Sequence, residues 1–276
     1  MTYLKILEEG KKNLRESDIE EADNDAWVLF SECFKMDRSR YILCMSDECP
    51  DDIAEKYFDL IRERMTRRPL QYIMGKAWFM GLEFTVGEGV LIPRFDTEIL
   101  VSEALKYVEG KRVLDLCTGS GCIAISLMTL GRPCGVVAAD ISDEALGIAA
   151  FNNEKLADNR VKLIKSDMFS NVDGCFDVIV SNPPYIKSSV IGELMPEVKD
   201  HEPGLALDGG GDGMYFYRLL TKEACSHLLP GGLLIMEIGY DQAFDVTELL
   251  KQYEYKDIRV IKDFNGLDRV ALGWRK

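Results

Sequence analysis

The second half of the chain alternates short apolar runs with amphipathic segments, and this alternation constrains the fold more than any other feature. The runs have strand length, and helical patterns separate most of them. Such alternation builds a mostly parallel sheet covered by helices on both faces, so the sequence predicts an α/β fold. The expected strands are 113–116, 136–139, 161–164, 178–180, 233–238 and 258–261, and the expected helices are 122–130, 143–156, 214–228 and 242–252.

One more apolar run, 269–272, follows the pair Asn265-Gly266 after a short gap. Asn-Gly is typical of tight hairpin turns. We therefore expect a last strand that is antiparallel and lies at the edge of the sheet.

The first part of the chain has a different pattern. Residues 1–75 carry apolar side chains at spacings of three and four, which predicts a small helical bundle. Residues 76–93 place apolar side chains among several glycines, which predicts a hairpin linker. The sequence thus divides into a helical domain (1–75), a linker (76–93) and an α/β domain (94–276).

Composition narrows the class of protein. The chain has 276 residues, a net charge of −14, eight scattered cysteines and only two histidines. No cysteine pair has zinc spacing, and a disulfide framework is not expected. The acidic balance argues against duplex nucleic acid and favours a small-molecule, protein or basic partner. The sequence shows neither a signal peptide nor a membrane span, so we expect a cytoplasmic protein.

A glycine turn follows the first strand of the expected sheet. The strand ends in Asp115 and Leu116, and the turn continues through Cys117, Thr118, Gly119, Ser120 and Gly121. Glycine lets the backbone approach a ligand closely. The next strand ends in Asp140, an acid placed to bind ribose hydroxyls. These two features suit a nicotinamide cofactor and S-adenosylmethionine equally.

Two acidic residues favour S-adenosylmethionine. Asp115 ends the first strand where a ligand amino group could bind. Asp167 follows the third strand, where it could accept a hydrogen bond from an adenine amino group, with Met168 and Phe169 as apolar ring contacts. Asp167 could equally serve as a helix cap or a turn residue.

The segment Asn182-Pro183-Pro184-Tyr185 follows another buried strand. Because proline lacks a backbone donor, this turn presents mainly acceptors. The Asn182 side-chain oxygen and the Pro183 carbonyl are placed to hold both hydrogens of a planar NH2 group, while Tyr185 packs against its face. We expect this substrate-binding turn to be catalytic, with Asn182 also contacting the cofactor. An ordinary β-turn is the alternative.

Four glycines lie in the segment 207–213, after the substrate-binding turn. Such a segment can be a mobile loop that closes over a site, and a simple connector is an equal alternative.

Taken together, these motifs resemble the peptide chain release factor N5-glutamine methyltransferases, which belong to the class I S-adenosylmethionine-dependent fold. The resemblance covers nearly the whole chain. It departs from the family pattern at Cys117, where glycine is usual, and at Phe95, where proline is common. The segments that carry it are 68–75, 91–98, 115–121, Asp140, 182–185, 202–207, 237–239 and 268–269.

The resemblance implies a Rossmann-like, seven-stranded sheet that binds S-adenosylmethionine. It implies that the substrate is the glutamine of the Gly-Gly-Gln motif in release factors, that the product is N5-methylglutamine, and that residues 1–75 help to recognise the factor. Two other classes remain open on the residues. One is an adenine-N6 nucleic-acid methyltransferase, which uses a similar turn on a flipped base. The other is a non-catalytic partner-binding module with a vestigial cofactor fold.

Overall fold

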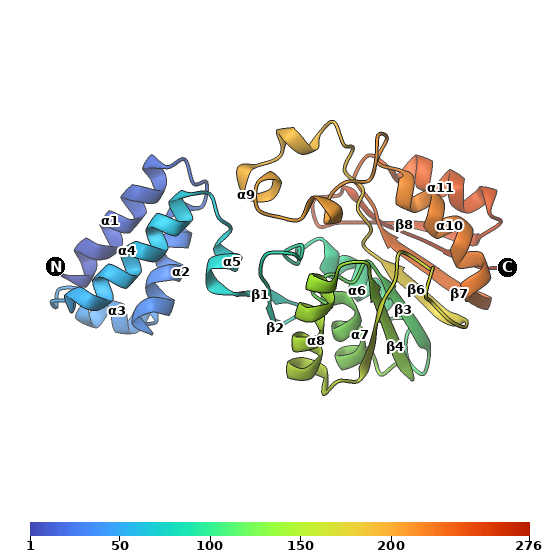
Figure 1. Cartoon of the computed structure of the whole chain (residues 1–276), viewed down its shortest axis with the longest axis horizontal. Coiled ribbons are helices and arrows are strands. Elements are labelled where there is room, and N and C mark those ends of the chain that lie inside the picture. Colours follow the sequence, from blue (N-terminus) through green and yellow to red (C-terminus); the bar gives the residue numbers. More distant parts are fainter. The chain divides into compact units, whose positions relative to one another are not determined.

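The computed structural model describes residues 1–276, which form two compact units (Figure 1). One unit comprises Met1–Gly75 together with Pro196–His201, and the other comprises Lys76–Met195 together with Glu202–Lys276. No helix is long and apolar enough to cross a membrane.

The helical unit contains α1 (Tyr3–Glu16), α2 (Ala22–Phe34), α3 (Arg38–Cys44), α4 (Asp51–Met65) and α5 (Leu70–Met74). Side-chain oxygens of Thr2 and Asp37 cap α1 and α3. The core between α1, α2 and α4 is aromatic, with Phe30 and Tyr57 at ring-centroid separation of 5.7 Å. The buried Tyr57 hydroxyl donates to the Ala26 carbonyl at 3.2 Å, so its polar atom is satisfied inside the core.

A short segment from the second half of the chain belongs to this helical unit. It is α9 (Pro196–Lys199), whose Glu197 accepts hydrogen bonds from Arg64 (3.0 Å) and Arg67 (2.7 Å). Arg64 also donates to Asp25 at 2.8 Å, and both of these side chains are only 7% exposed. This buried charge network fixes α9 on the helical unit.

The α/β unit contains a seven-stranded sheet with the order β5-β4-β3-β6-β7-β9-β8. Neighbouring strands from β5 to β7 are parallel, and β9 is antiparallel to β7 and to β8. The strands are β3 (Arg112–Leu116), β4 (Gly135–Asp140), β5 (Val161–Lys165), β6 (Phe176–Ser181), β7 (Leu228–Glu237), β8 (Lys256–Lys262) and β9 (Asp268–Trp274).

The expectation of an antiparallel edge strand is wrong in one respect. The antiparallel strand β9 lies between β7 and β8, and β8 forms the edge. The physical reason is burial. Residues 269–273 of β9 are all buried, whereas β8 carries exposed charged side chains, which suit a sheet edge.

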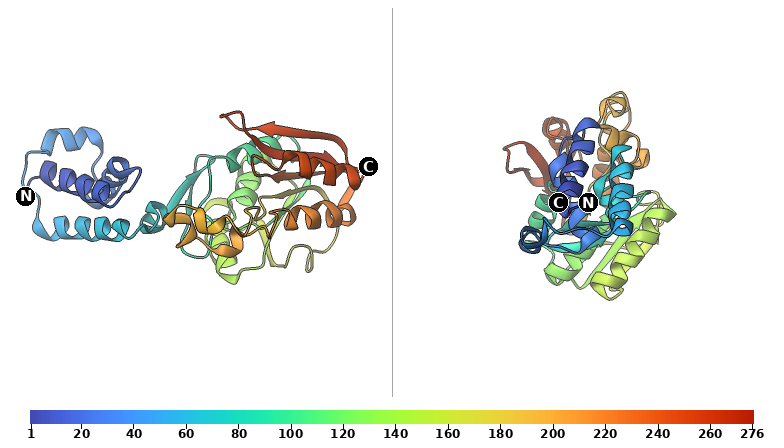
Figure 2. Two further views of the ribbon diagram at one scale, coloured as in Figure 1. Left: turned by 90° about the horizontal axis from the view of Figure 1, so that it is seen from above. Right: turned by 90° about the vertical axis from the view of Figure 1, so that its left-hand side faces the viewer.

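Helices cover both faces of the sheet, as alternation predicts. On one face pack α6 (Thr97–Ala104), α7 (Cys122–Gly131) and α8 (Asp143–Ala157), and on the other α10 (Tyr215–His227) and α11 (Ala243–Gln252). Successive residues of β3 point to opposite faces, so Val113 joins the first core and Leu114 the second. The green helices and the orange-red helices lie on different sides of the strands (Figure 1, Figure 2).

A two-stranded hairpin begins the α/β unit. It pairs β1 (Lys76–Phe79) with β2 (Leu82–Thr85) in antiparallel register. The buried Asn152 of α8 exchanges hydrogen bonds with the Thr85 backbone (2.7 and 2.9 Å) and donates to the Ser120 carbonyl (2.9 Å). One amide side chain therefore joins the hairpin, α8 and the glycine turn.

Candidate active site

A cavity of the α/β unit lies at the carboxyl ends of its parallel strands. It has a volume of about 410 Å³, and residues that follow β3, β4, β5 and β6 line it. Strand β3 pairs with both β4 and β6, so chain connections diverge to opposite sides at this point. Ligands of open α/β sheets bind at such a switch point. The expected site residues in its lining are Cys117, Thr118, Gly119, Ser120, Asp140, Asp167, Met168, Asn182 and Pro184.

Asp115 is completely buried beneath the glycine turn. Its Oδ2 accepts hydrogen bonds from the Thr118 hydroxyl (2.6 Å) and the Ala124 amide (3.2 Å). Its Oδ1 is buried and has no partner. Burial raises the pKa of this carboxyl group to about 7, and these two hydrogen bonds limit the rise. This buried oxygen without a partner can accept a hydrogen bond from a cationic group of a ligand.

Asp140 orders the turn as well as lining the cavity. Its Oδ2 accepts from the Gly119 amide at 2.8 Å, and its Oδ1 accepts from the Ser142 amide at 3.0 Å. A carboxylate oxygen has more than one lone pair, so both oxygens can still accept hydroxyl donors from a ligand.

Cys117 adopts a left-handed backbone conformation, with φ of +59°. Glycine takes this conformation without penalty, and a side chain makes it costlier, by about 1 kcal/mol or more. The Cys117 sulfur lies 3.8 Å from the Met168 sulfur at the cavity wall. The substitution thus keeps the backbone of a glycine and adds a polarisable contact.

Three expected cofactor contacts do not line the cavity: Asp115, which is completely buried, Phe169 and Gly121. Phe169 is buried in the sheet core and stacks on His227, with ring centroids 4.6 Å apart. Gly121 is the N-cap residue just before α7, where a Cβ would meet the Ile125 side chain at 2.8 Å, so this glycine serves close packing. Asp167 is exposed at the rim, and Met168 lies below it in the wall.

The substrate-binding turn starts at the end of β6, beside the glycine turn. The Asn182 Nδ2 group donates to the Thr97 hydroxyl at 3.2 Å, and its Oδ1 has no partner within the protein. Asn182 and Pro184 line the cavity, whereas Pro183 is buried outside its lining. The structure therefore brings a free amide oxygen to the cavity that also contains Asp140.

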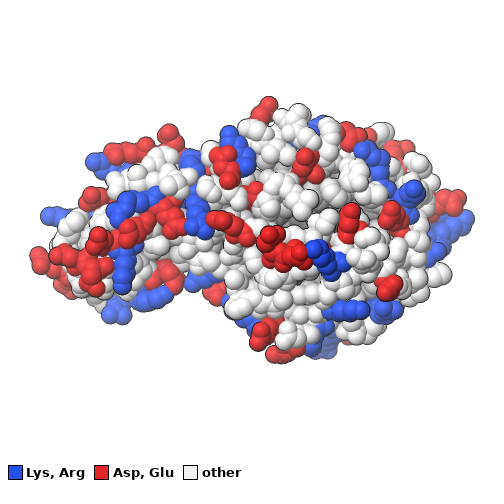
Figure 3. Space-filling view, in the orientation of Figure 1, with Lys and Arg blue, Asp and Glu red and all other residues white.

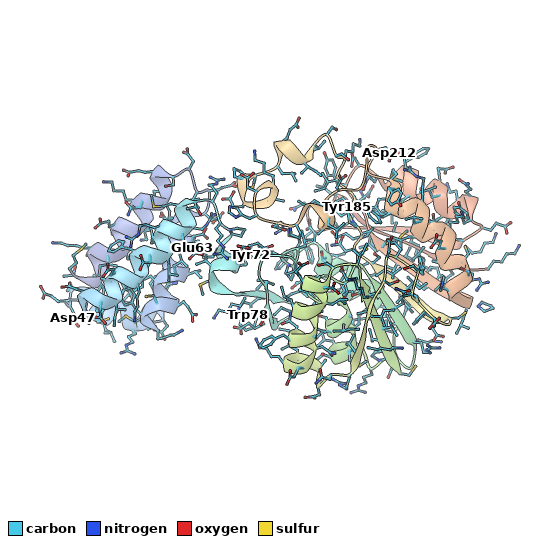
Figure 4. The ribbon with its side chains drawn as sticks, in the orientation of Figure 1. Asp47, Glu63, Tyr72, Trp78, Tyr185 and Asp212 are labelled. Carbon is cyan, nitrogen blue, oxygen red and sulfur yellow. The ribbon has the colours of Figure 1, made fainter.

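Tyr185 is a partly buried residue of the α/β unit (Figure 4). Its hydroxyl donates to Glu237 Oε1 at 3.1 Å, and its carbonyl accepts from Gln242 Nε2 at 3.0 Å. The ring packs against the sheet core and is not part of the cavity lining. Bonds at both its backbone and its side chain fix the end of the turn.

The glycine-rich segment 207–213 packs directly against this turn. Its backbone forms hydrogen bonds with residues 186 and 188, including Ile186 N to Leu207 O (3.0 Å) and Gly209 N to Ile186 O (2.8 Å). A Cβ at Gly209 would lie 2.6 Å from the Tyr185 Cα. In this structure the segment supports Tyr185, and a closing motion over the site is not required to explain its glycines.

Sequence reasoning gave no role to four residues of this site. Arg94 lines the cavity and donates to Glu202 Oε1 at 2.5 Å. Thr97 and Glu237 lie behind Asn182 and Tyr185. The sequence did contain a signal for these residues, because all four lie in segments that carry the family resemblance. The sequence does not show that these residues lie close together, because about 140 residues separate Thr97 from Glu237 and local patterns do not report such contacts.

The cavity fits S-adenosylmethionine. Its volume lies in the range of sites for ligands of this size. Asp140 in the lining suits ribose hydroxyls. The partnerless Asp115 Oδ1, which is buried outside the lining, suits an ammonium group. The Ser120 hydroxyl is also buried without a partner, which leaves a further polar group for a ligand.

Two family models match the chain. Residues 5–75 match the "PrmC N-terminal domain", and residues 94–197 match the "Methyltransferase small domain".

Relatives match over nearly the full length. A release factor glutamine methyltransferase of Clostridium acetobutylicum is 41% identical over 95% of this chain and 94% of its own. One of Geobacter sulfurreducens is 39% identical over 99% of this chain and 96% of its own.

Solved structures share the fold of the α/β unit. A methyltransferase from Pyrococcus furiosus has a TM-score of 0.55 and 24% identity, over 71% of this chain and 89% of that one. The relatives that match over nearly the full length of the chain, together with the site, show the family. The chain is an S-adenosylmethionine-dependent methyltransferase that belongs to the release factor glutamine methyltransferase family.

Proposed function

We propose that this protein methylates the side-chain amide nitrogen, N5, of the glutamine in the Gly-Gly-Gln motif of peptide chain release factors. One observation carries the proposal: the free Asn182 Oδ1 belongs to the cavity lined by the glycine turn and Asp140. An acceptor beside the cofactor site suits an uncharged NH2 group as the methyl acceptor. The names of the long relatives support a release factor as its source.

Different residues of the chain would bind different groups of S-adenosylmethionine. Asp115 would bind the amino group, Asp140 the ribose hydroxyls and Asp167 the adenine amino group, with Met168 against the ring. Backbone groups of the glycine turn, Cys117 to Gly121, would surround the rest. When bound, S-adenosylmethionine would supply an electrophilic methyl group, whose bond to the sulfonium sulfur breaks as the substrate amide nitrogen bonds to the methyl carbon, with S-adenosylhomocysteine as the product that leaves.

Asn182 and Pro183 would hold the amide nitrogen of the substrate glutamine. The Asn182 oxygen and the Pro183 carbonyl would accept the two amide N–H bonds. An amide nitrogen is a weak nucleophile, and positive charge grows on it as it reacts, so preorganised acceptors stabilise the transition state. Holding the nitrogen in place contributes on the order of 7–11 kcal/mol in well-oriented systems.

Pro184 and Tyr185 shape the site around these acceptors. Pro184 lines the cavity, and Tyr185, held at both ends, fixes the turn and shields it from water. An N-methylated, protonated amide loses its proton to water readily. A strong general base is therefore not needed in the site.

We assign substrate recognition to residues 1–75, linkage to residues 76–93 and methyl transfer to residues 94–276. Support comes from the separate helical unit, none of whose residues line the cavity. The resemblance and the matching N-terminal model are consistent with this division. We place the reaction in the cytoplasm, with release factors as protein partners.

The test is transfer of radiolabelled methyl groups to a purified release factor. The matched control is the same factor with the motif glutamine replaced by alanine. We expect label on the first protein and none on the second. Equal labelling of the two would contradict the proposed substrate.

Two further measurements in the same experiment test the two alternative functions. Label appearing on DNA or RNA and absent from the factor would support an adenine-N6 methyltransferase. Binding of the factor without cofactor dependence, and without label on any substrate, would support a non-catalytic module. On the visible face of the molecule acidic and basic side chains are interspersed, and no extended basic patch suited to nucleic acid is present there (Figure 3).

A further inference from the structure

Arg94 is the only lysine or arginine in the lining of the cavity. The same lining contains three acidic residues, Asp140, Glu144 and Asp167. Acidic walls alone would suit a ligand whose charged groups are all positive. S-adenosylmethionine is not such a ligand, because it carries a negative carboxylate besides its positive sulfonium and ammonium groups. The single cation of the lining therefore matches the single anion of the cofactor.

Arg94 lies at the end of the cavity where the methyl group is transferred. Its carbonyl accepts a hydrogen bond from the Thr97 amide at 3.1 Å, and the Thr97 hydroxyl accepts from Asn182 at 3.2 Å. The proposed adenine contact, Asp167, follows β5, which β4 and β3 separate from β6 and Asn182. The methionine part of the cofactor is bonded to the sulfur that carries the methyl group. It therefore lies on the Asn182 side, a placement that rests on the proposed function.

The guanidinium group of Arg94 has one partner and keeps other donors free. Its Nη2 donates to Glu202 Oε1 at 2.5 Å, and the Arg94 side chain makes no other hydrogen bond. This side chain is 38% exposed, so its remaining N–H groups are accessible to a ligand. A guanidinium can hold two carboxylates at once, as Arg64 does in the helical unit with Asp25 and Glu197.

Glu202 fixes the position of this guanidinium group. Its own side chain is only 1% exposed, and it directly precedes residues 203–206, which line the cavity. The ion pair therefore joins Arg94 to another wall of the same cavity. A purely structural role of the pair, in which Arg94 only holds that wall in place, is the alternative. The two roles predict different patterns of ligand binding.

The amide of the substrate glutamine is an unfavourable ligand for Arg94. A cation on the amide oxygen would draw electron density away from the nitrogen. It would thereby oppose the positive charge that grows on the nitrogen during methyl transfer. A cation on the cofactor carboxylate has no such effect, because that group is not conjugated with the reacting atoms.

We propose that Arg94 binds the carboxylate of S-adenosylmethionine, and that Glu202 is a positioning residue for its guanidinium group. Both charged groups of the amino-acid part then have a partner, since Asp115 binds the ammonium group and Arg94 the carboxylate. A ligand without the carboxylate loses the contact with Arg94 and keeps the contact with Asp115. The protein thus selects the cofactor by its amino-acid part as well as by its adenosine.

Calorimetric titration with a pair of unreactive ligands tests this assignment without any methyl transfer. The ligands are S-adenosyl-L-homocysteine and its decarboxylated derivative, which retains the amino group. For each protein, the ratio of the two dissociation constants measures the preference for the carboxylate. We expect this preference to be lower in Arg94→Gln than in wild type by about tenfold or more, because a hydrogen-bonded charge pair is lost.

Two further variants make the comparison specific. Arg94→Lys keeps a cation without the planar fork, and its preference should lie between those of wild type and Arg94→Gln. Arg218→Gln is the matched control, because the Arg218 guanidinium also pairs with a carboxylate, that of Asp212, outside the cavity lining. Its preference should equal that of wild type. A wild-type preference in Arg94→Gln, whether both affinities fall by the same factor or neither falls, would overturn the inference.

The inference and the proposed function fail in different ways. A wild-type protein that shows the carboxylate preference, and transfers no methyl group to a release factor, contradicts the proposed function alone. A protein that methylates the factor, and whose Arg94→Gln variant keeps the wild-type preference, contradicts the inference alone.

Discussion

The Tyr185 hydroxyl donates a hydrogen bond of 3.1 Å to Glu237 Oε1. This bond joins the end of the substrate-binding turn to the end of β7, and its acceptor is a carboxyl group buried in the sheet. Phe replacement of Tyr185 keeps the ring and deletes the bond. We expect Tyr185→Phe to be less stable by about 1 kcal/mol and to retain measurable methylation.

Thermal unfolding and steady-state kinetics measure both effects. Tyr185→Ala is the companion variant, because it also removes the ring that shields the site. It should lose much more activity than Tyr185→Phe. Equal losses in the two variants would show that the hydroxyl, and not the ring, is the important group.

Asp140 gives a prediction about cofactor affinity. Asp140→Ala removes the proposed ribose acceptor and the bond to the Gly119 amide at 2.8 Å, so binding should weaken at least about tenfold. Calorimetric titration with S-adenosylmethionine measures the effect. Asp143→Asn is the control, because Asp143 is exposed and pairs with Lys165 on the surface. Wild-type affinity in Asp140→Ala would mean that the ribose lies elsewhere.

Asp115 predicts a pH dependence of the same binding step. Because burial raises its pKa to about 7, the group is mostly neutral at pH 6 and mostly ionised at pH 8. Only the ionised form attracts an ammonium group, so affinity for S-adenosylmethionine should rise with pH across this range. Asp115→Asn should bind weakly with a flat profile. A wild-type affinity that falls between pH 6 and 8 would contradict the assignment of the amino group to Asp115.

The glycine-rich segment predicts a steric effect on the site. Gly209→Ala places a Cβ 2.6 Å from the Tyr185 Cα, so the turn must shift, and kcat should fall about tenfold or more. Gly211→Ala is a matched control two residues away, where a Cβ meets nothing within 4 Å. Kinetics of the pair separate a supporting role of the segment from a general need for flexibility, which would make both variants slow.

Sequence reasoning anticipated the fold well, for a physical reason. The apolar runs of a parallel sheet and the amphipathic helices between them are local patterns, so their type and order were readable. The position of β9 was not, because strand order depends on pairing between residues far apart in sequence. The buried run 269–273 against the charged face of β8 was the available clue.

The site was readable only in part. Asp140 and Asn182 were expected because each follows a strand at the same sheet edge, and both line one cavity. Phe169 was expected to contact the cofactor, and the structure places it in the core against His227 instead. Neighbours in sequence after a strand alternate between cavity and core, and composition does not say which is which. Thr97 and Glu237 meet Asn182 and Tyr185 only through the folded sheet.

The buried charge network of the helical unit predicts a local loss of stability. Glu197→Ala removes the partner shared by Arg64 and Arg67, which should destabilise the helical unit by about 3 kcal/mol. Hydrogen exchange of peptides from α2 and α4 should then be faster than in wild type. Glu193→Ala, at an exposed site, is the control and should leave exchange unchanged. Unchanged protection in Glu197→Ala would show that the network does not hold the unit together.

Tandem mass spectrometry of a release factor incubated with S-adenosylmethionine and either wild-type protein or Asn182→Ala tests the central claim most directly. Calorimetry on both proteins first confirms that each binds the cofactor. We predict one added methyl group, located on the glutamine of the Gly-Gly-Gln motif, with wild-type protein and almost none with Asn182→Ala. A methyl group on any other residue, or equal modification by the two proteins, would contradict the account.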